Sequence, residues 1–233
     1  MHEYVDVFAG HFPLGAMTLI PSWSVYHPDN KIGEDSSQVQ YMSFFRDAVS
    51  KFVSAKMYHR KGTKEEHVKC IKNEIKKNVL EGRYYEIYSC YLILLDQREY
   101  MKQNGIKLNI EQRTNLICNN LLKYNVLVGV VERMSESMEL FQHVLDSKDE
   151  VVDLFVQYGM KTKDGKDAPA SVSRASNVNP ISTSSIVEEL EKDEHIYPML
   201  KEYVKYEQQI TDFANVIHAR QYESMMQGKQ QQA

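Results

Sequence analysis

The pattern of apolar and polar positions changes from strand to helix periodicity at Arg46-Asp47. The preceding run, Val39–Phe45, is rich in aromatic residues and contains valine, a composition typical of β-strands. From Ala48 onward, apolar residues recur close to helical spacing, at Phe52, Ala55 and Met57 or Tyr58. The pattern therefore predicts a strand, a short turn and a helix.

The same periodicities predict further strands and helices along the chain. Two more segments are typical of strands: Tyr4–Phe8 and Val126–Val131, the second introduced by Asn125. Helices are predicted near Glu65–Leu80, Tyr84–Gln103, Ile110–Tyr124, Ser135–Leu145, Glu150–Tyr158, Ser185–Lys192 and Glu194–Met226, with Ser135 as a candidate N-cap. Residues 160–185 predict a long surface loop, and the Gln-rich residues 227–233 predict a disordered tail.

Strands and many helices in one chain indicate an α/β fold with more helix than usual. A length of 233 residues suits one sizeable core, and we predict a single domain over residues 1–226. The net charge of -4 gives no general attraction to nucleic acid or anionic membranes, so we expect no nucleic-acid partner. No stretch approaches the ~20 apolar residues that a membrane span needs.

Cysteine and histidine positions give no metal-ligand spacing, so no metal site is predicted. The three cysteines, Cys70, Cys90 and Cys118, are an odd number, which argues against a complete disulfide framework. Five further histidines are scattered along the chain without metal-ligand spacing: His59, His67, His143, His195 and His218. The Lys-rich run Lys61–Lys77 contains glutamates and indicates a solvated helix face, with glycan binding as the alternative.

A strand–turn–helix at Arg46 is a candidate anion site. The first N–H groups of such a helix point at one spot and favour negative charge. Arg46 adds a planar fork suited to phosphate or sulfate oxygens, and Ser54 adds a hydroxyl two turns into the helix. The alternative is a buried βα unit whose Arg-Asp turn is merely solvated.

The segment Arg46–Tyr58, RDAVSKFVSAKMY, resembles the R-D-P-V-x-R-F-x-S-x-Y signature of the carbohydrate (heparan-sulfate-type) sulfotransferases. In that family the Arg and the Ser bind the 3′-phosphate of the sulfonate donor PAPS. The resemblance therefore implies that Arg46 and Ser54 bind this phosphate. The sequence departs from the signature at Ala48, Lys51 and Lys56.

Three further segments are similar to family motifs in the same order. Ala9–Gly15, AGHFPLG, resembles the G-H-F-P-x-G segment, which implies that His11 is the catalytic base. Val128–Ser137 resembles V-G-L-x-E-R-x-x-E-S, and Tyr206–Ala214 resembles the closing Y-E-x-x-I-x-x-F-A helix. In relatives, a loop with basic and hydroxyl residues closes over the donor, which implies donor-binding roles for Arg174 and Ser176.

The resemblance implies a P-loop-like sulfotransferase fold, in which a small parallel sheet carries helices on both faces. It also implies sulfonate transfer from PAPS to a hydroxyl of a carbohydrate-type acceptor, without a metal. Relatives are commonly Golgi-lumenal behind a membrane anchor, but no anchor or signal peptide pattern opens this chain, so its localisation stays open.

One family feature is missing from the sequence. The K-x-G-T loop that cradles the 5′-phosphosulfate precedes the G-H-F-P segment in relatives, and the residues before Gly10 are too few for it. Lys61-Gly62-Thr63 follows no strand and does not replace this loop. Two interpretations stay open: an N-terminally incomplete enzyme, or a catalytically inactive sulfotransferase-like protein that serves as a binding or assembly subunit. Glu132 and Arg133, after the second predicted strand, are either a structural ion pair or part of the donor pocket.

Overall fold

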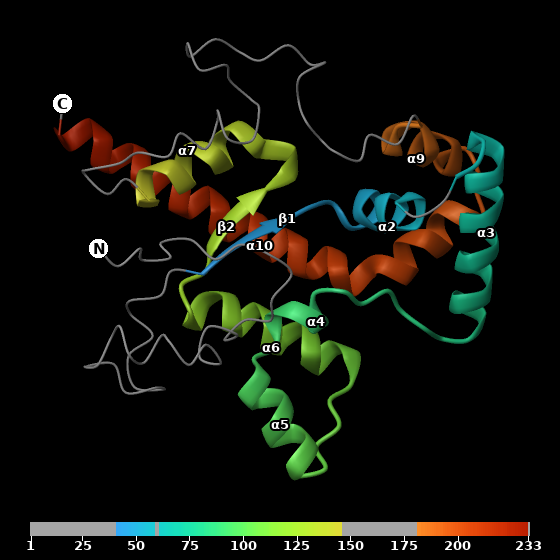
Figure 1. The fold of residues 1–233 in the computed structure, drawn as a ribbon, viewed down its shortest axis with the longest axis horizontal. Helices are drawn as coiled ribbons and strands as arrows, with labels where there is room; N and C mark the ends of the chain where they lie inside the picture. Colours follow the sequence, from blue (N-terminus) through green and yellow to red (C-terminus); the bar gives the residue numbers. More distant parts are fainter. Residues whose placement is uncertain (1–40, 59–60, 146–180, 233) are drawn as a thin grey trace, which may run out of the picture. The chain divides into compact units, whose positions relative to one another are not determined.

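The computed structural model describes residues 41–58, 61–145 and 181–232 (Figure 1). In chain order the elements are β1 (Met42–Phe45), α2 (Ala48–Met57), α3 (Lys64–Leu80), α4 (Ser89–Leu92), α5 (Leu95–Gln103), α6 (Ile110–Lys123), β2 (Leu127–Val130), the 3-10 helix η3 (Val131–Arg133), α7 (Met134–Leu145), α9 (Thr183–Glu191) and α10 (Ile196–Gln232). The described residues form two compact units. One comprises Tyr41 with Glu86–Val126, and the other comprises residues 42–85 with residues 127–232. That residues 1–226 form a single domain stays a prediction.

A small parallel sheet lies in the second unit. Strands β1 and β2 pair in parallel, from Met42 opposite Leu127 to Phe45 opposite Val130. The predicted helix-rich α/β character with a small parallel sheet is therefore confirmed. Helix α2 begins at Ala48, as the periodicity predicts.

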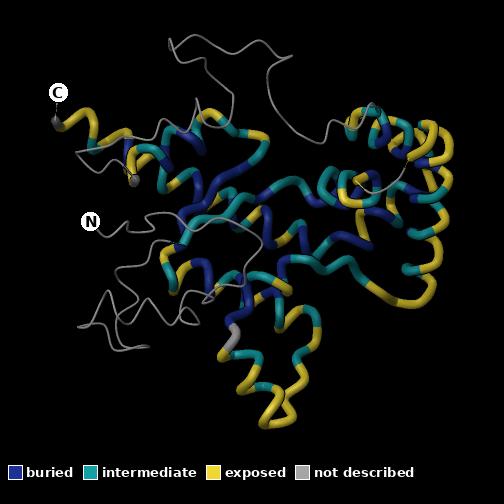
Figure 2. Tube along the Cα trace, viewed as in Figure 1, coloured by how far each residue is buried: buried dark blue, intermediate teal, exposed yellow. Residues whose placement is uncertain are grey.

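The N-terminal half of α10 packs in an apolar cluster with α2, α3 and α9. The buried members of this cluster are Ala48, Val49, Phe52, Val53, Met57, Val68, Ile71, Ile75, Ile186, Leu190, Ile196, Leu200, Tyr203 and Val204. The rings of Phe52 and Tyr203 meet edge to face, with centroids 5.4 Å apart. Burial of these side chains, visible as dark blue along α2 in Figure 2, provides the main stabilisation of this half of the unit.

The C-terminal half of α10 packs against β2 and α7. Leu127, Leu140, Phe141 and Met225 form a second buried cluster, with Phe44 packed against it. Side chains of α10 and α7 also complete the free edge of β2. The Val128 N–H donates to Gln221 Oε1 at 3.0 Å, and the Val130 N–H donates to Ser137 Oγ at 2.8 Å. These bonds satisfy donors that an exposed strand edge would leave to water or to another chain.

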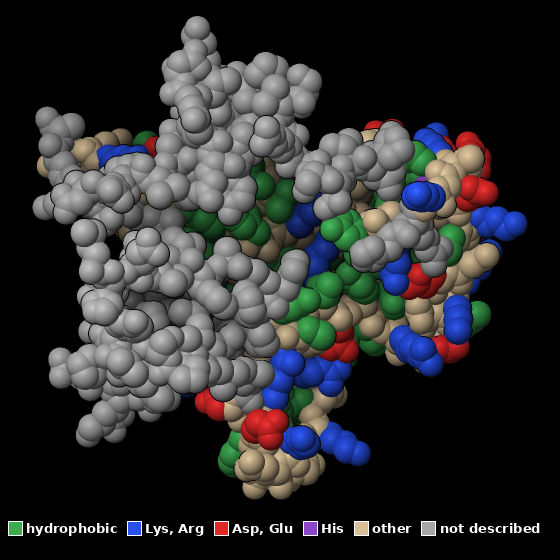
Figure 3. Space-filling view, in the orientation of Figure 1, with side chains coloured by type: hydrophobic (Ala, Val, Ile, Leu, Met, Phe, Trp, Pro, Cys, Tyr) green, Lys and Arg blue, Asp and Glu red, His purple; other side chains and the backbone are tan. Residues whose placement is uncertain are grey.

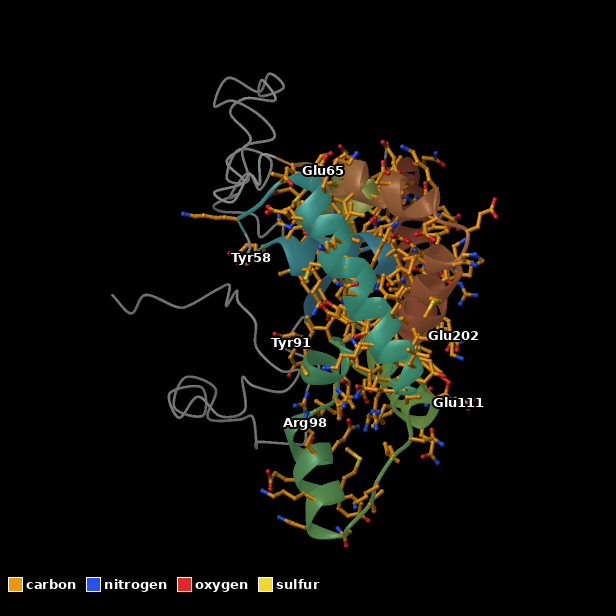
Figure 4. All side chains as sticks on the ribbon, turned by 90° about the vertical axis from the view of Figure 1, so that its right-hand side faces the viewer. Tyr58, Glu65, Tyr91, Arg98, Glu111 and Glu202 are labelled. Carbon is orange, nitrogen blue, oxygen red and sulfur yellow. The ribbon has the colours of Figure 1, made fainter. Side chains whose placement is uncertain are left out.

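One helix predicted for the first unit is divided into two in the structure. Instead of one helix over Tyr84–Gln103, the structure has α4 and α5, separated by Ile93 and Leu94 in extended conformation. Arg98 accounts for the break, because its guanidinium donates to the carbonyl oxygens of Ile93 at 3.1 Å and Ser89 at 2.7 Å. These bonds satisfy carbonyl groups near the end of α4. Figure 4 labels Tyr91 in α4 and Arg98 in α5, on either side of the break.

Side-chain hydrogen bonds hold α6 in this first unit. Arg113 of α6 binds Glu86 through two bonds of 2.8 and 2.7 Å. The buried amide of Asn120 donates to Leu92 O at 2.8 Å. Helix α5 is exposed along most of its length, which is visible as yellow in Figure 2.

Two other predictions about helix ends are wrong. Helix η3 runs directly into α7, so Ser135 is the second residue of α7 and not its N-cap. The tail predicted to be disordered from Gln227 is helical in the structure, because α10 continues to Gln232 and Lys229 bonds Glu139 of α7 at 2.8 Å.

Within the part of the chain that the structure describes, Cys70, Cys90 and Cys118 form no disulfide with one another. Burial raises the pKa of Cys118 to about 11, so this thiol is protonated at neutral pH. Across residues 41–58, 61–145 and 181–232, none of the helices combines the length and apolar character needed to cross a bilayer.

Candidate functional site

Two charged turns meet where the parallel strands end. Arg46-Asp47 follows β1, and Glu132-Arg133 follows β2. Because β1 and β2 are parallel neighbours, their carboxyl ends lie at one edge of the sheet, which is where open α/β sheets bind ligands. The Asp47 N–H donates to Glu132 Oε1 at 3.1 Å, so the two turns are in contact.

Side chains of the protein itself bond the first amides of α2. Asp47 is the N-cap and accepts from the Ser50 N–H at 2.8 Å. The Ala48 N–H donates to Gln208 Oε1 of α10 at 3.0 Å, and Glu132 Oε1 accepts a hydrogen bond from the Asp47 N–H. The sequence predicts that these amides face an anion. In the structure they instead donate to side-chain oxygens of Asp47, Gln208 and Glu132. The Gln208 oxygen comes from α10, and the Glu132 oxygen comes from the residues that follow β2.

Arg46 and Ser54 are the remaining predicted anion ligands at this corner. Both are half-buried. Ser54 lies on the same helix face as Ser50 and Lys51, outside the stripe of α2 that includes the buried Phe52. From Ala48 to Ser54 the helix rises about 9 Å, so the long Arg46 side chain must extend along α2 for both groups to reach one phosphate.

One turn of α10 holds this corner together. Thr211 Oγ1 lies 3.1 Å from the Arg46 carbonyl oxygen and 3.0 Å from that of Glu207, and donates its hydrogen to one of them. Lys51 Nζ donates to Glu207 Oε2 at 2.6 Å. Burial lowers the pKa of Lys51 to about 8, an effect that the neighbouring Glu207 carboxylate partly offsets. The backbone of the Arg46 turn is thus fixed from α10, and Lys51 stays mostly cationic at neutral pH.

Glu132 and Arg133 do not pair with each other. Arg133 bonds Glu136, three residues further along, and Glu132 bonds the Asp47 amide. The predicted Glu132–Arg133 ion pair is therefore wrong. The other interpretation, that these residues line a donor pocket, stays a prediction.

A buried Ser–His contact lies near the end of β2. Ser137 Oγ is 3.1 Å from His218 Nε2, 2.8 Å from the Val130 nitrogen and 3.0 Å from the Arg133 carbonyl oxygen, and both side chains are fully buried. A hydroxyl has one hydrogen to donate, and here carbonyl oxygens lie within its reach. We therefore assign the Nε2–H tautomer to His218, which donates to Ser137. A ring nitrogen that donates cannot take the hydroxyl proton, so this pair is not a nucleophile with its base.

The remaining predicted site residues have different outcomes. His11, Arg174 and Ser176 lie outside the described residues. The Lys-rich run forms most of α3, and Figure 3 shows basic and acidic side chains interspersed over α3 and α9 at the right of the view. Lys72, for example, bonds Asp193 at 2.6 Å. This mixed surface agrees with a solvated helix face.

Sequence reasoning missed the polar residues of α10 that contact the site. Glu207, Gln208, Thr211 and His218 share the helix face that contacts α2, β2 and α7. The available signal was the spacing of Glu207, Thr211 and His218. Each lies three or four residues from the apolar position Ile210 or Ala214, which places polar groups on a buried stripe.

Comparison of the chain with protein-family models, with curated proteins and with solved structures gave no match.

Proposed function

We propose that this chain is a PAPS-dependent sulfotransferase of the carbohydrate type, with a P-loop-like sulfotransferase fold. Arg46 and Ser54 bind the 3′-phosphate of the donor. His11 accepts the proton of the acceptor hydroxyl, and Arg174 and Ser176 close over the donor. The acceptor is a carbohydrate-type hydroxyl.

One observation carries the proposal. Three of the four segments that resemble family motifs, Arg46–Tyr58, Val128–Ser137 and Tyr206–Ala214, meet at a single corner of the second unit. The Arg46 turn contacts the second segment through Glu132, and the third through Gln208 and Thr211. Residues at least 85 positions away in the sequence thus contact the backbone of the turn that carries Arg46, which supports a shared role for the motifs.

In the proposed reaction each residue has a distinct task. Sulfonate transfer is an in-line displacement, in which the protein mainly positions the reactants and stabilises charge. The acceptor oxygen forms a new bond to sulfur, the bond from sulfur to the donor phosphate oxygen breaks, and the acceptor proton passes to His11. Arg46 and Ser54 take no part in bond making. They orient the donor through its ribose phosphate, and α10 fixes the backbone from which Arg46 extends.

Calorimetric titration with PAP, the desulfonated donor product, tests the proposal. Removal of the phosphate contact by Arg46→Ala should weaken binding by about 1.5–3 kcal/mol, or roughly 10- to 150-fold. Arg220→Ala is the matched control, because it removes an exposed guanidinium from α10 and should leave PAP affinity unchanged. Equal affinity in the wild type and Arg46→Ala, or no binding to the wild type, would remove Arg46 from this role.

A second candidate function has its own supporting observation. Glu132 and Gln208 bond the α2 amides that would otherwise assist anion binding. This arrangement favours a catalytically inactive sulfotransferase-like protein that serves as a binding or assembly subunit. A direct assay separates the two: the enzyme transfers labelled sulfonate from PAPS to a glycan acceptor, whereas the subunit transfers none even where PAP binds.

A further inference from the structure

The contact between Ser137 and His218 joins three elements of the second unit. Ser137 is in the first turn of α7, Val130 ends β2, and His218 is in the C-terminal half of α10, which lies alongside both (Figure 1). Neither side chain has solvent exposure. The three elements are therefore linked through one hydroxyl group.

The hydrogen bonds fix which nitrogen of His218 takes up a proton. Nε2 carries its hydrogen toward Ser137 Oγ, so Nδ1 is the basic atom. Among the residues that the structure describes, Nδ1 is buried and has no hydrogen-bond partner. A proton added there would create a buried cation with no acceptor for its new N–H.

The charged groups around His218 do not compensate such a cation. Arg133, the last residue of η3, and Glu136 of α7 shift the pKa of the imidazole in opposite directions and bond each other. On α10, the Tyr222 ring stacks on the imidazole with an interplanar angle of 4°, and its hydroxyl donates to Glu139 of α7. Glu139 in turn bonds Lys229. Strands β1 and β2 contribute no titratable side chain.

We propose that the Ser137–His218 contact is an acid-sensitive latch. The neutral imidazole holds α10 to β2 and α7, and its protonation weakens this attachment. Burial, together with Arg133, lowers the pKa of His218 below its usual value, which agrees with the geometry.

The direction of the effect follows from proton linkage. Because the folded protein holds the proton on His218 less tightly than the unfolded chain, the unfolded chain binds more protons as the pH falls below about 6.5. Stability from this group is complete above that pH and is lost as the pH falls toward the folded pKa. The unfolding equilibrium constant therefore rises on acidification, by up to about tenfold between pH 7.5 and 5.5 for one buried histidine.

Urea unfolding of the wild type, His218→Gln and His143→Gln at these two pH values tests the latch. Gln can donate to Ser137 but does not titrate. The unfolding equilibrium constant of His218→Gln should therefore rise much less on acidification than that of the wild type. His143→Gln removes an exposed histidine of α7 and should keep the wild-type rise. If the unfolding equilibrium constant of His218→Gln rises by a factor within about twofold of the wild-type factor, the proposal is overturned.

NMR titration of the wild type provides a measurement that does not depend on folding of the variant. The imidazole signals of His218 should stay those of a neutral Nε2–H ring well below pH 6.5 in the folded protein. A folded-state midpoint at or above about 6.5 would overturn the latch, whatever the variants do.

Discussion

Lys51 of α2 and Glu207 of α10 form an ion pair inside the second unit, with 2.6 Å between Nζ and Oε2. The Glu207 side chain is 2% exposed and that of Lys51 is 16% exposed. The pair ties the helix that follows Arg46 to the middle of α10, next to the Thr211 contact with the Arg46 backbone. The position of the candidate site therefore depends on a charge pair outside it.

Lys51→Met should destabilise the protein strongly. The substitution leaves the buried Glu207 carboxylate without this cation, and loss of one partner of a buried pair costs about 3–5 kcal/mol. Urea unfolding at pH 7 measures the loss. The double variant Lys51→Met/Glu207→Leu removes both charges and should recover most of the stability. A double variant no more stable than Lys51→Met would show that loss of the Lys51 cation beside the Glu207 carboxylate is not the cause.

Gly129→Ala should destabilise the sheet through a steric clash. A Cβ at Gly129 would lie 2.6 Å from Phe44 Cε1 and 2.9 Å from Phe141 Cζ. These two rings pack against each other with centroids 5.0 Å apart, so they have little room to move. We expect a loss of about 1–3 kcal/mol in the free energy of unfolding.

Gly228→Ala is the control for this substitution. Gly228 is inside α10, and a Cβ there meets no atom within 4 Å. Replacement of a helical glycine by alanine should therefore stabilise the protein by about 0.5–1 kcal/mol. Effects of the same sign in both variants would contradict the clash at Gly129.

Ser137→Ala should destabilise the junction of β2, α7 and α10. It removes the acceptor of the Val130 N–H and of His218 Nε2, both of which are buried. Each unsatisfied buried donor costs about 1–3 kcal/mol. Ser135→Ala, at an exposed position of the same helix, should change stability by less than about 0.5 kcal/mol. Thermal unfolding compares the two, and similar small effects would count against the assigned hydrogen bonds.

Local sequence signals predicted most elements of the described chain. Helix α2 begins at the predicted Ala48, where Asp47 provides an N-cap. The predicted helix near Glu65–Leu80 begins at Lys64, after a capping box formed by Thr63 and Glu66. The break at Ile93 and Leu94 was not predicted, because apolar residues continue through it and the bonds that stabilise it come from the Arg98 side chain.

The candidate site was predicted only in part, because its contacts are tertiary. The position of Arg46 between a strand and a helix follows from local periodicity. The hydrogen bonds that Glu132 and Gln208 accept from the first amides of α2 do not follow from it, because these residues are 85 and 160 positions from their partners. For the same reason the sequence does not distinguish His218 from the other scattered histidines, whereas the fold places it beside Ser137.

The proposal that Arg46 recognises a 3′-phosphate can be tested by comparing two ligands. PAP and 5′-AMP differ only in that phosphate, so calorimetry of both with wild type, Arg46→Ala and the control Arg220→Ala isolates the contact. We expect wild type and the control to prefer PAP, and Arg46→Ala to lose roughly 10- to 150-fold in PAP affinity with 5′-AMP affinity nearly unchanged. An equal loss for both ligands, or no loss for PAP, would contradict the claim.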